Sequence, residues 1–192
     1  FPGLYVAIAA FHTEMLPTSF LLSIATARTG IVIPVALEVL LMEFQFELLK
    51  EAGIHLPGQL GGTIGIVGGL IVGQAAVEAG IVSTIVVIVV SFTAIASFIV
   101  PNESFGAVFR LLKFLFIVTA AIWGIYGYLL TFAALLLHLS QIESFGVPYM
   151  LPSVCGENLN YDDKKDHYVR YPFAYMKKRP VFTREGRRIR KR

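Results

Sequence analysis

Carboxylate side chains recur at every fourth residue in one apolar segment of the chain. Glu43, Glu47 and Glu51 share one face of the helix that the surrounding leucine, phenylalanine and methionine residues predict. On insertion scales, each carboxylate would cost about 2.5 kcal/mol or more at the centre of a lipid bilayer. We therefore expect this acidic face to lie at the membrane interface, to pack against protein or to line water.

A second polar pair, Gln74 and Glu78, lies four residues apart in an otherwise apolar segment. Polar side chains inside a membrane are costly, and they often mark ion or substrate pathways. Glu78 is therefore either a pathway carboxylate or a structural one, hydrogen-bonded at a helix end near the lipid headgroups. Glu43 and Glu47 are likewise candidates for a pathway or for a solvated face at the interface.

The sequence predicts no catalytic residues, no metal site and no cofactor. It contains no GxSxG, Walker, GxGxxG or HExxH motif. Its histidines, His12, His55, His138 and His167, lack the spacing of a metal site. The single cysteine, Cys155, permits no internal disulfide, and we interpret it as an inert thiol.

The elements that position these side chains are predicted to lie in a membrane. Hydrophobic residues make up 56% of the 192 residues and charged residues 15%, whereas soluble domains carry about 25% charged residues. Residues 81–100 and 114–137 contain no Asp, Glu, Lys, Arg or His side chain. At about 1.5 Å per residue, each run covers the roughly 30 Å hydrocarbon core of a bilayer.

Glycines at every fourth residue mark a further predicted helix over residues 60–79. Helices in lipid associate through close van der Waals contact, which a stripe of small residues permits. We expect this stripe to pack against another helix, either within the subunit or between subunits. Its members are Gly61, Gly65, Gly69 and Gly73.

The predicted fold class is all-α: a polytopic transmembrane helical bundle with an interfacial or re-entrant amphipathic helix and a basic C-terminal tail. Residues 1–11 are predicted to end a truncated transmembrane helix, since the chain opens inside an apolar run. Residues 12–59 form a connector and the amphipathic acidic helix, and residues 60–140 form transmembrane helices, the last over 107–139. Residues 141–192 form the tail.

The charge distribution predicts which side of the membrane the tail faces. Residues 1–140 hold four Lys/Arg and seven Asp/Glu, whereas residues 141–192 hold twelve and six. Basic residues near the last span favour the cytoplasmic side, so the tail is expected to be cytoplasmic. We expect its terminal basic cluster to bind anionic lipid and not nucleic acid.

Seven short strings, in this order along the chain, resemble the GerA-type spore germination receptor A subunit. They are PGLYVAI (2–8), FHTEMLPT (11–18), EVLLME (38–43), FELLKEAGIHLP (46–57), GQAAVEAG (73–80), RLLKF (110–114) and SFGVPY (144–149). The sporulation stage V homologue of the A subunit is a close relative with the same fold. The GQAAVEA and FGVPY strings favour the receptor branch.

The resemblance implies an A subunit that works with a transporter-like B subunit and a lipoprotein C subunit in the spore inner membrane. It further implies that nutrients trigger the complex, that ions are released, and that A subunits form a homo-oligomer around a central pore. Nutrient recognition would lie largely in the B subunit. A soluble domain and a first span would precede the residues given.

Three functions remain open. The chain forms or gates the ion-release pathway, with carboxylates such as Glu43, Glu47 and Glu78 attracting cations. Alternatively it is a non-conducting scaffold that couples a nutrient-binding, transporter-like subunit to another channel. As a third possibility it is a secondary transporter subunit, although such proteins carry inverted repeats and this sequence shows no internal repeat.

Overall fold

The computed structural model describes residues 1–54, 60–100, 103–145, 147–150 and 172. Backbone alone is described for residues 54, 60–66, 70, 98, 103–104 and 147–148. The chain divides into two compact units, Phe1–Phe132 and Ala133–Arg192. Most of the predicted tail, together with Cys155, lies outside the described residues.

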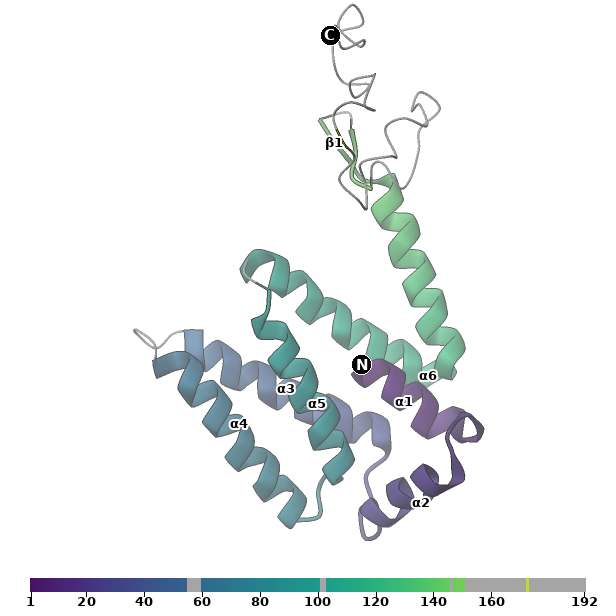
Figure 1. Ribbon diagram of the computed structural model, residues 1–192, viewed down its shortest axis with the longest axis vertical. Coiled ribbons are helices and arrows are strands. Elements are labelled where there is room, and N and C mark those ends of the chain that lie inside the picture. The colour runs from purple at the N-terminus through teal and green to yellow at the C-terminus, as the bar shows by residue number, and fades with distance from the viewer. Residues whose placement is uncertain (55–59, 101–102, 146, 151–171, 173–192) are drawn as a thin grey trace, which may run out of the picture. The chain divides into compact units, whose positions relative to one another are not determined.

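Helices make up nearly all of the described structure (Figure 1). They are α1 (Pro2–Phe11), the short 3₁₀ helix η1 (Thr13–Met15), α2 (Thr18–Ala27), α3 (Val35–Ile54), α4 (Leu60–Glu78), α5 (Thr84–Phe98) and α6 (Glu103–Gln141). The all-α prediction is confirmed in that the described residues are mostly helical, and the uncharged run 81–100 contains α5.

Helix starts follow local signals in the sequence. Before α3, the Pro34 carbonyl accepts hydrogen bonds from the backbone N–H groups of Leu37 and Glu38, at 3.0 and 3.1 Å. Pro34 therefore precedes the first helical residue directly, where its fixed φ is compatible with a helix start. At α5, the Ser83 hydroxyl accepts from the Val86 N–H at 3.4 Å and caps the helix.

The end of α4 is set by a glycine. Gly80 has φ +67, a left-handed conformation that glycine adopts at little cost. Its N–H donates to the Val77 carbonyl at 2.9 Å, and the Ile81 N–H donates to the Ala76 carbonyl at 3.0 Å. These two bonds form a Schellman motif, which satisfies carbonyls that the helix end leaves open. The chain can then turn directly into α5.

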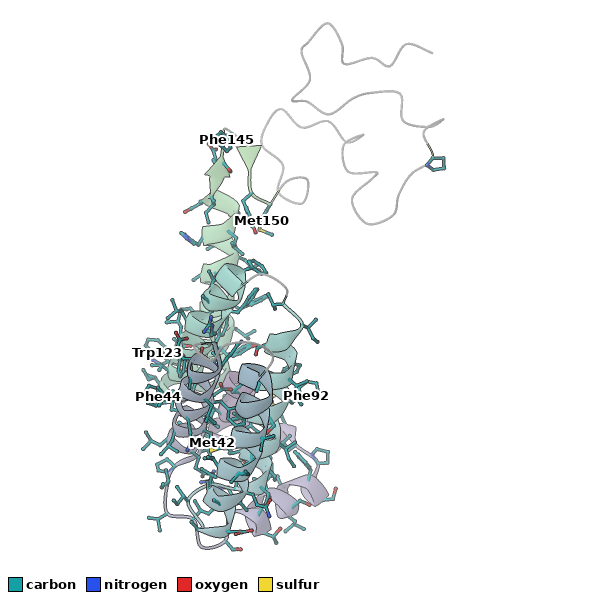
Figure 2. All side chains as sticks on the ribbon, turned by 90° about the vertical axis from the view of Figure 1, so that its left-hand side faces the viewer. Met42, Phe44, Phe92, Trp123, Phe145 and Met150 are labelled. Carbon is teal, nitrogen blue, oxygen red and sulfur yellow. The ribbon has the colours of Figure 1, made fainter. Side chains whose placement is uncertain are left out.

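The core lies where α1, α3, α5 and α6 meet. It is built from Val6, Ala7, Val35, Val39, Met42, Val82, Val86, Val90, Ile117 and Ala120. Figure 2 shows Met42 between the helices. On the α1 side, a Cβ added at Gly3 would lie 3.0 Å from the Phe116 carbonyl oxygen, so α1 and α6 approach closely there.

The outer surface of the first unit carries large apolar side chains. On α3, Leu37, Leu41, Phe44 and Leu48 are all exposed, at the spacing of one helix face. On α5 and its C-terminal cap, exposed residues with the same spacing are Ile88, Phe92, Ile95 and Ile99. Figure 2 shows Phe44 and Phe92 on the outside. An exposed apolar surface of this extent marks contact with lipid or protein.

Helix α6 contains a break that its apolar sequence does not predict. Gly124 has φ +63 and ψ −140 inside the helix, and the chain changes direction there (Figure 1). Beyond the break, the Thr131 hydroxyl donates to the Thr119 hydroxyl at 2.9 Å. The last helix, predicted over 107–139, is therefore present as α6, and its bounds differ from the expected ones by a few residues. Gly124 divides it into two arms, the first before this glycine and the second after it.

One helix among the described residues, Phe105–Gln141, is long and apolar enough to cross a membrane by length and composition. Pro2–Phe11, Thr18–Ala27, Val67–Glu78 and Thr84–Ser97 are apolar but shorter. The prediction of several spans therefore stays a prediction.

The second unit contains the end of α6 and a short antiparallel ribbon. Its strands are β1 (Glu143–Ser144) and β2 (Val147–Pro148), with Ser144 opposite Val147. Phe145, between them, has φ 54, which is typical of a tight turn.

Candidate functional site

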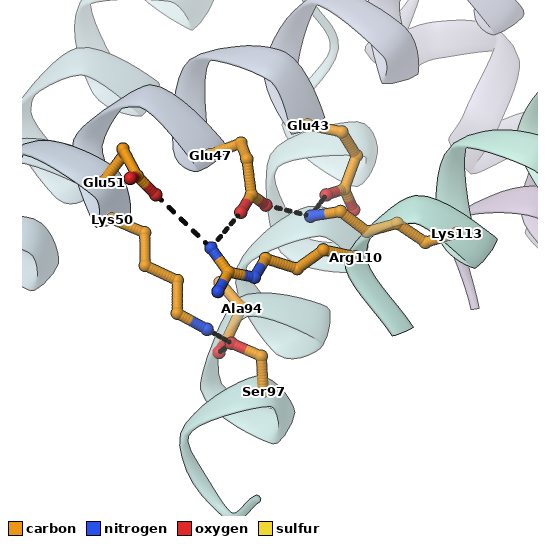
Figure 3. A network of polar contacts seen from close by, with 8 residues as sticks. All are labelled: Glu43, Glu47, Lys50, Glu51, Ala94, Ser97, Arg110 and Lys113. Atoms are coloured by element: carbon orange, nitrogen blue, oxygen red, sulfur yellow. Dashed lines mark hydrogen bonds and ion pairs between the residues drawn. The ribbon is translucent and has the colours of Figure 1, made fainter. Parts of the chain in front are cut away.

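Ion pairs connect α3 to α6 in a continuous series (Figure 3). Lys113 Nζ donates to Glu43 Oε2 at 2.7 Å and to Glu47 Oε2 at 3.0 Å. Arg110 Nη1 donates to Glu47 Oε1 at 3.0 Å and to Glu51 Oε2 at 3.5 Å. We call these five residues the α3–α6 ion-pair network.

The spacing of the charges along the two helices explains the network. The three glutamates are four residues apart on α3, so they lie one above another on a single face. Arg110 and Lys113 are three residues apart on α6 and also share a face. Each cation therefore lies between two successive carboxylates.

Burial increases along the network from Glu51 to Glu43. The Glu51 side chain is 57% exposed and Glu47 22%, whereas Glu43 is 2% exposed. Charges attract more strongly where water is excluded, and an unpaired buried charge is correspondingly costly. Among the ion pairs of the network, Glu43–Lys113 is therefore the one for which the loss of one partner should cost most.

A cavity of about 500 Å³ lies beside the network, among α3, α5 and α6. Glu43, Glu47, Arg110 and Lys113 form one edge of it. Lys50, also on this edge, donates to the Ser97 hydroxyl of α5 at 3.1 Å (Figure 3). Lys50, beside the network on α3, thus contacts α5.

A second buried ion pair lies at the start of α3. Glu38 is fully buried, and its Oε1 lies 3.0 Å from Arg28 Nη2. Its Oε2 accepts from the Ser83 backbone N–H, also at 3.0 Å, while Arg28 donates to the Ile33 carbonyl. One carboxylate therefore joins the α2–α3 connection to the beginning of α5.

The predicted acidic face is present, and the structure shows what it contacts. Of the three expected environments, packing against protein is observed for Glu43 and Glu47. For Glu43 the solvated-face alternative is wrong, because the side chain is buried and paired with Lys113. Sequence reasoning missed Arg110 and Lys113 as partners, although two basic residues three apart at the start of the last apolar run were a usable signal.

Gln74 and Glu78 lie outside the network. Gln74 Nε2 donates to Glu78 Oε1 at 3.2 Å, within α4, and both side chains are exposed. Their role as a pathway or as a structural pair stays a prediction.

The structure shows the neighbours of two of the four glycines in the predicted stripe. A Cβ at Gly69 would lie 2.6 Å from Phe46 Cε1 of α3, and one at Gly73 would lie 3.2 Å from Val87 Cγ1 of α5. These two glycines therefore pack α4 inside the subunit. Gly61 and Gly65 belong to α4, but their contacts lie outside what the structure describes.

Comparison with known proteins gives one consistent family. Residues 1–182 match the family described as Bacillus/Clostridium GerA spore germination protein. Spore germination protein GerLA of Bacillus cereus is 42% identical over 94% of this chain and 36% of its own length. Spore germination protein A1 of Bacillus subtilis is 46% identical, with 84% of this chain and 33% of its own length covered.

A further relative is named as a membrane protein. The uncharacterized membrane protein YfkQ of Bacillus subtilis is 43% identical over 93% of this chain and 34% of its own length. The chain thus spans about a third of the length of these curated relatives. No solved structure matches. The match over residues 1–182 shows that the chain belongs to the GerA family of spore germination proteins.

Proposed function

We propose that this chain is the membrane part of a spore germinant receptor subunit that responds to nutrients and forms or gates an ion-release pathway. Membership of the GerA family and relatives named as spore germination proteins support the receptor role. In this proposal the subunit forms a homo-oligomer and works with a transporter-like B subunit and a lipoprotein C subunit. It lies in the spore inner membrane with its tail in the cytoplasm.

The distribution of polar and apolar side chains supports lipid as the surroundings of the first unit. Glu38 and Glu43 are buried, whereas Leu37, Leu41 and Phe44 on the same helix are exposed. A helix in water shows the opposite arrangement. In a bilayer, charged side chains face the protein interior and pair with one another, as Glu43 does with Lys113. This is the observation on which the proposal depends.

The pairing also suggests how the network would contribute. Glu43 and Glu47 both receive hydrogen bonds from Lys113, so much of their negative field is neutralised within the subunit. Paired carboxylates attract a passing cation less than free ones do. We therefore assign the network to gating, in which it holds α3 against α6 until the receptor is triggered.

Gln74 and Glu78 are better placed to face the pathway itself. Both side chains are exposed on α4, a helix whose exposed residues Val67 and Ile71 are apolar. An exposed carboxylate is unfavourable against lipid, so this face of α4 would meet water or a neighbouring subunit. Placement at a water-filled path would make Glu78 a cation-attracting group.

A non-conducting scaffold is the second candidate. The neutralisation of Glu43 and Glu47 by Lys113 favours it, because a scaffold needs firm helix packing and no cation-attracting carboxylates. In this alternative the subunit transmits a nutrient signal to a separate channel.

Conductance of the purified full-length subunit in liposomes separates the two candidates. The proposal predicts a conductance that Glu78→Gln reduces, because the pathway loses a negative charge. Glu14→Gln, which removes an exposed carboxylate outside α4, is the matched control and should leave the conductance unchanged. Absence of conductance from a folded, oligomeric subunit would favour the scaffold.

A further inference from the structure

The bend in α6 divides the apolar run that would cross a membrane. Residues 114–137 contain no Asp, Glu, Lys, Arg or His and, as one continuous helix, would extend about 36 Å. The bend at Gly124 splits this run into residues 114–123 and 125–137, which extend about 15 Å and about 20 Å. The hydrocarbon core of a bilayer is roughly 30 Å thick. The run can therefore span it as a single helix only where α6 is straight.

The bent form depends on two buried glycines. Gly124 has φ +63, which residues with a side chain rarely adopt. Gly127 lies against the first arm, and a Cβ at this position would collide with the Thr119 carbonyl oxygen. Glycine is also tolerated inside a regular helix, at a modest cost. The sequence therefore permits the bend and leaves a straight α6 accessible.

Contacts between the two arms exist only in the bent form. The ring centroids of Phe116 and Tyr128 lie 4.9 Å apart, and the Thr131 hydroxyl donates to the Thr119 hydroxyl at 2.9 Å. The members of each pair are twelve residues apart, a separation of about 18 Å along a straight helix. These contacts offset part of the cost of opening backbone hydrogen bonds inside an apolar helix.

The end of α1 lies at the bend. A Cβ added at Gly124 would lie 3.0 Å from His12 Cε1 and 3.0 Å from Phe11 Cβ. The ring centroids of His12 and Tyr126 are 5.9 Å apart, and the two rings meet edge to face. Because Tyr126 belongs to the second arm, this contact joins the end of α1 to the part of α6 beyond the break.

We propose that α6 changes between the bent form and a straight, membrane-spanning form, and that the end of α1 holds it in the bent form. Helical dihedral angles at Gly124 would redirect Tyr126 and carry Thr131 away from Thr119, so straightening breaks the contacts that the bend makes. Movement of α1 away from Tyr126 therefore favours the straight form. This proposal goes beyond the receptor role, because the shape of α6 can be measured without germination or conductance.

Pulsed electron paramagnetic resonance of the full-length subunit in liposomes tests the two forms. Nitroxide labels are attached at Leu115→Cys and Leu130→Cys, two exposed positions on either side of the break, in a background without native cysteines. A straight helix places these positions about 22 Å apart, and the bend brings them closer. The unaltered subunit should show mainly the shorter distance. Gly124→Ala, strained at φ +63 and crowded by α1, should show mainly the longer one.

Variants at the contact with α1 test what holds the bend. His12→Ala removes the ring contact and should raise the share of the longer distance several-fold. Tyr126→Ala removes the same contact from the α6 side, should act in the same way, and decides if His12→Ala fails to fold. Phe20→Ala, at an exposed ring on α2, is the matched control and should change nothing.

Three results would overturn the proposal. One is a distance distribution that neither His12→Ala nor Tyr126→Ala changes, because the end of α1 would then not hold the bend. Another is a shorter distance retained in Gly124→Ala, because α6 would then have no accessible straight form. The third is an unaltered subunit that shows mainly the longer distance.

Discussion

The ammonium group of Lys113 on α6 lies 2.7 Å from the buried carboxylate of Glu43 on α3. The same nitrogen lies 3.0 Å from Glu47, so one cation holds two carboxylates on successive turns of α3. The exposed face of α3 is apolar at Leu41 and Phe44. Attraction between charges, with water excluded, therefore adds to the apolar packing of α3 and α6 in the core.

Removing the cation of this pair should destabilise the subunit strongly. Lys113→Met leaves Glu43 buried and uncompensated, and we expect a loss of about 3–5 kcal/mol in the free energy of unfolding. Glu51→Gln, on the same face of α3 but 57% exposed, is the control and should cost about 1 kcal/mol or less. Thermal unfolding in detergent measures both. Equal effects would show that the burial of Glu43 has no energetic consequence.

Glu38 should be as important as Glu43 for stability. Glu38→Ala removes the acceptor of the Ser83 N–H and leaves Arg28 unpaired, so a loss of about 3–5 kcal/mol is expected. Glu14→Ala, at an exposed carboxylate, should change the unfolding free energy by no more than about 0.5 kcal/mol. The same unfolding assay applies. A Glu38→Ala variant as stable as the control would show that the buried ion pair of Glu38 with Arg28 does not stabilise the subunit.

A side chain at Gly69 should separate α4 from α3. In Gly69→Ala the new Cβ would lie 2.6 Å from Phe46 Cε1, and we expect a loss of about 1–3 kcal/mol from overpacking. Gly106→Ala is the matched control, since its Cβ would meet nothing within 4 Å. Phe46→Leu should rescue Gly69→Ala in part. Failure of this rescue would place the cause of destabilisation elsewhere.

The break in α6 can be tested by crosslinking. Thr119→Cys with Thr131→Cys, in a Cys155→Ser background, should form a disulfide on mild oxidation because the two hydroxyls lie 2.9 Å apart. In a continuous helix, twelve residues span about 18 Å, which is too far for a disulfide.

Leu111→Cys with Trp123→Cys, also twelve residues apart but within the first arm of α6, is the negative control and should not crosslink. Crosslinking of neither pair in a folded subunit would mean that α6 runs straight through Gly124.

The helices themselves could be predicted from the sequence because their signals are local. Pro34 before α3, Gly80 after α4 and the uncharged run in α5 act through backbone geometry and hydropathy alone. The acidic face of α3 could also be predicted, because Glu43 and Glu47 lie one helical turn apart. The bounds of α4 agree with the expected ones within a residue, and α5 lies within the uncharged run 81–100.

The pairing between helices could not be predicted in the same way. Glu43 and Lys113 are 70 residues apart, and nothing local specifies which cation meets which carboxylate. The break at Gly124 was missed because glycine is common in membrane helices, and Gly127, close by, lies in regular helix. An added Cβ at Gly124 would lie 3.0 Å from atoms of Phe11 and His12 at the end of α1, and these neighbours are remote in sequence.

Nutrient-triggered ion release from spores carrying the full-length receptor tests the gating role of the network most directly. The decisive variants are Glu43→Lys, Lys113→Glu and the double exchange, compared at equal receptor levels. Each single change places like charges together and should alter ion release several-fold, whereas the double exchange restores an opposite pair and should return release towards that of the unaltered receptor. Normal release from both single variants, or a double exchange no better than either, would contradict the account.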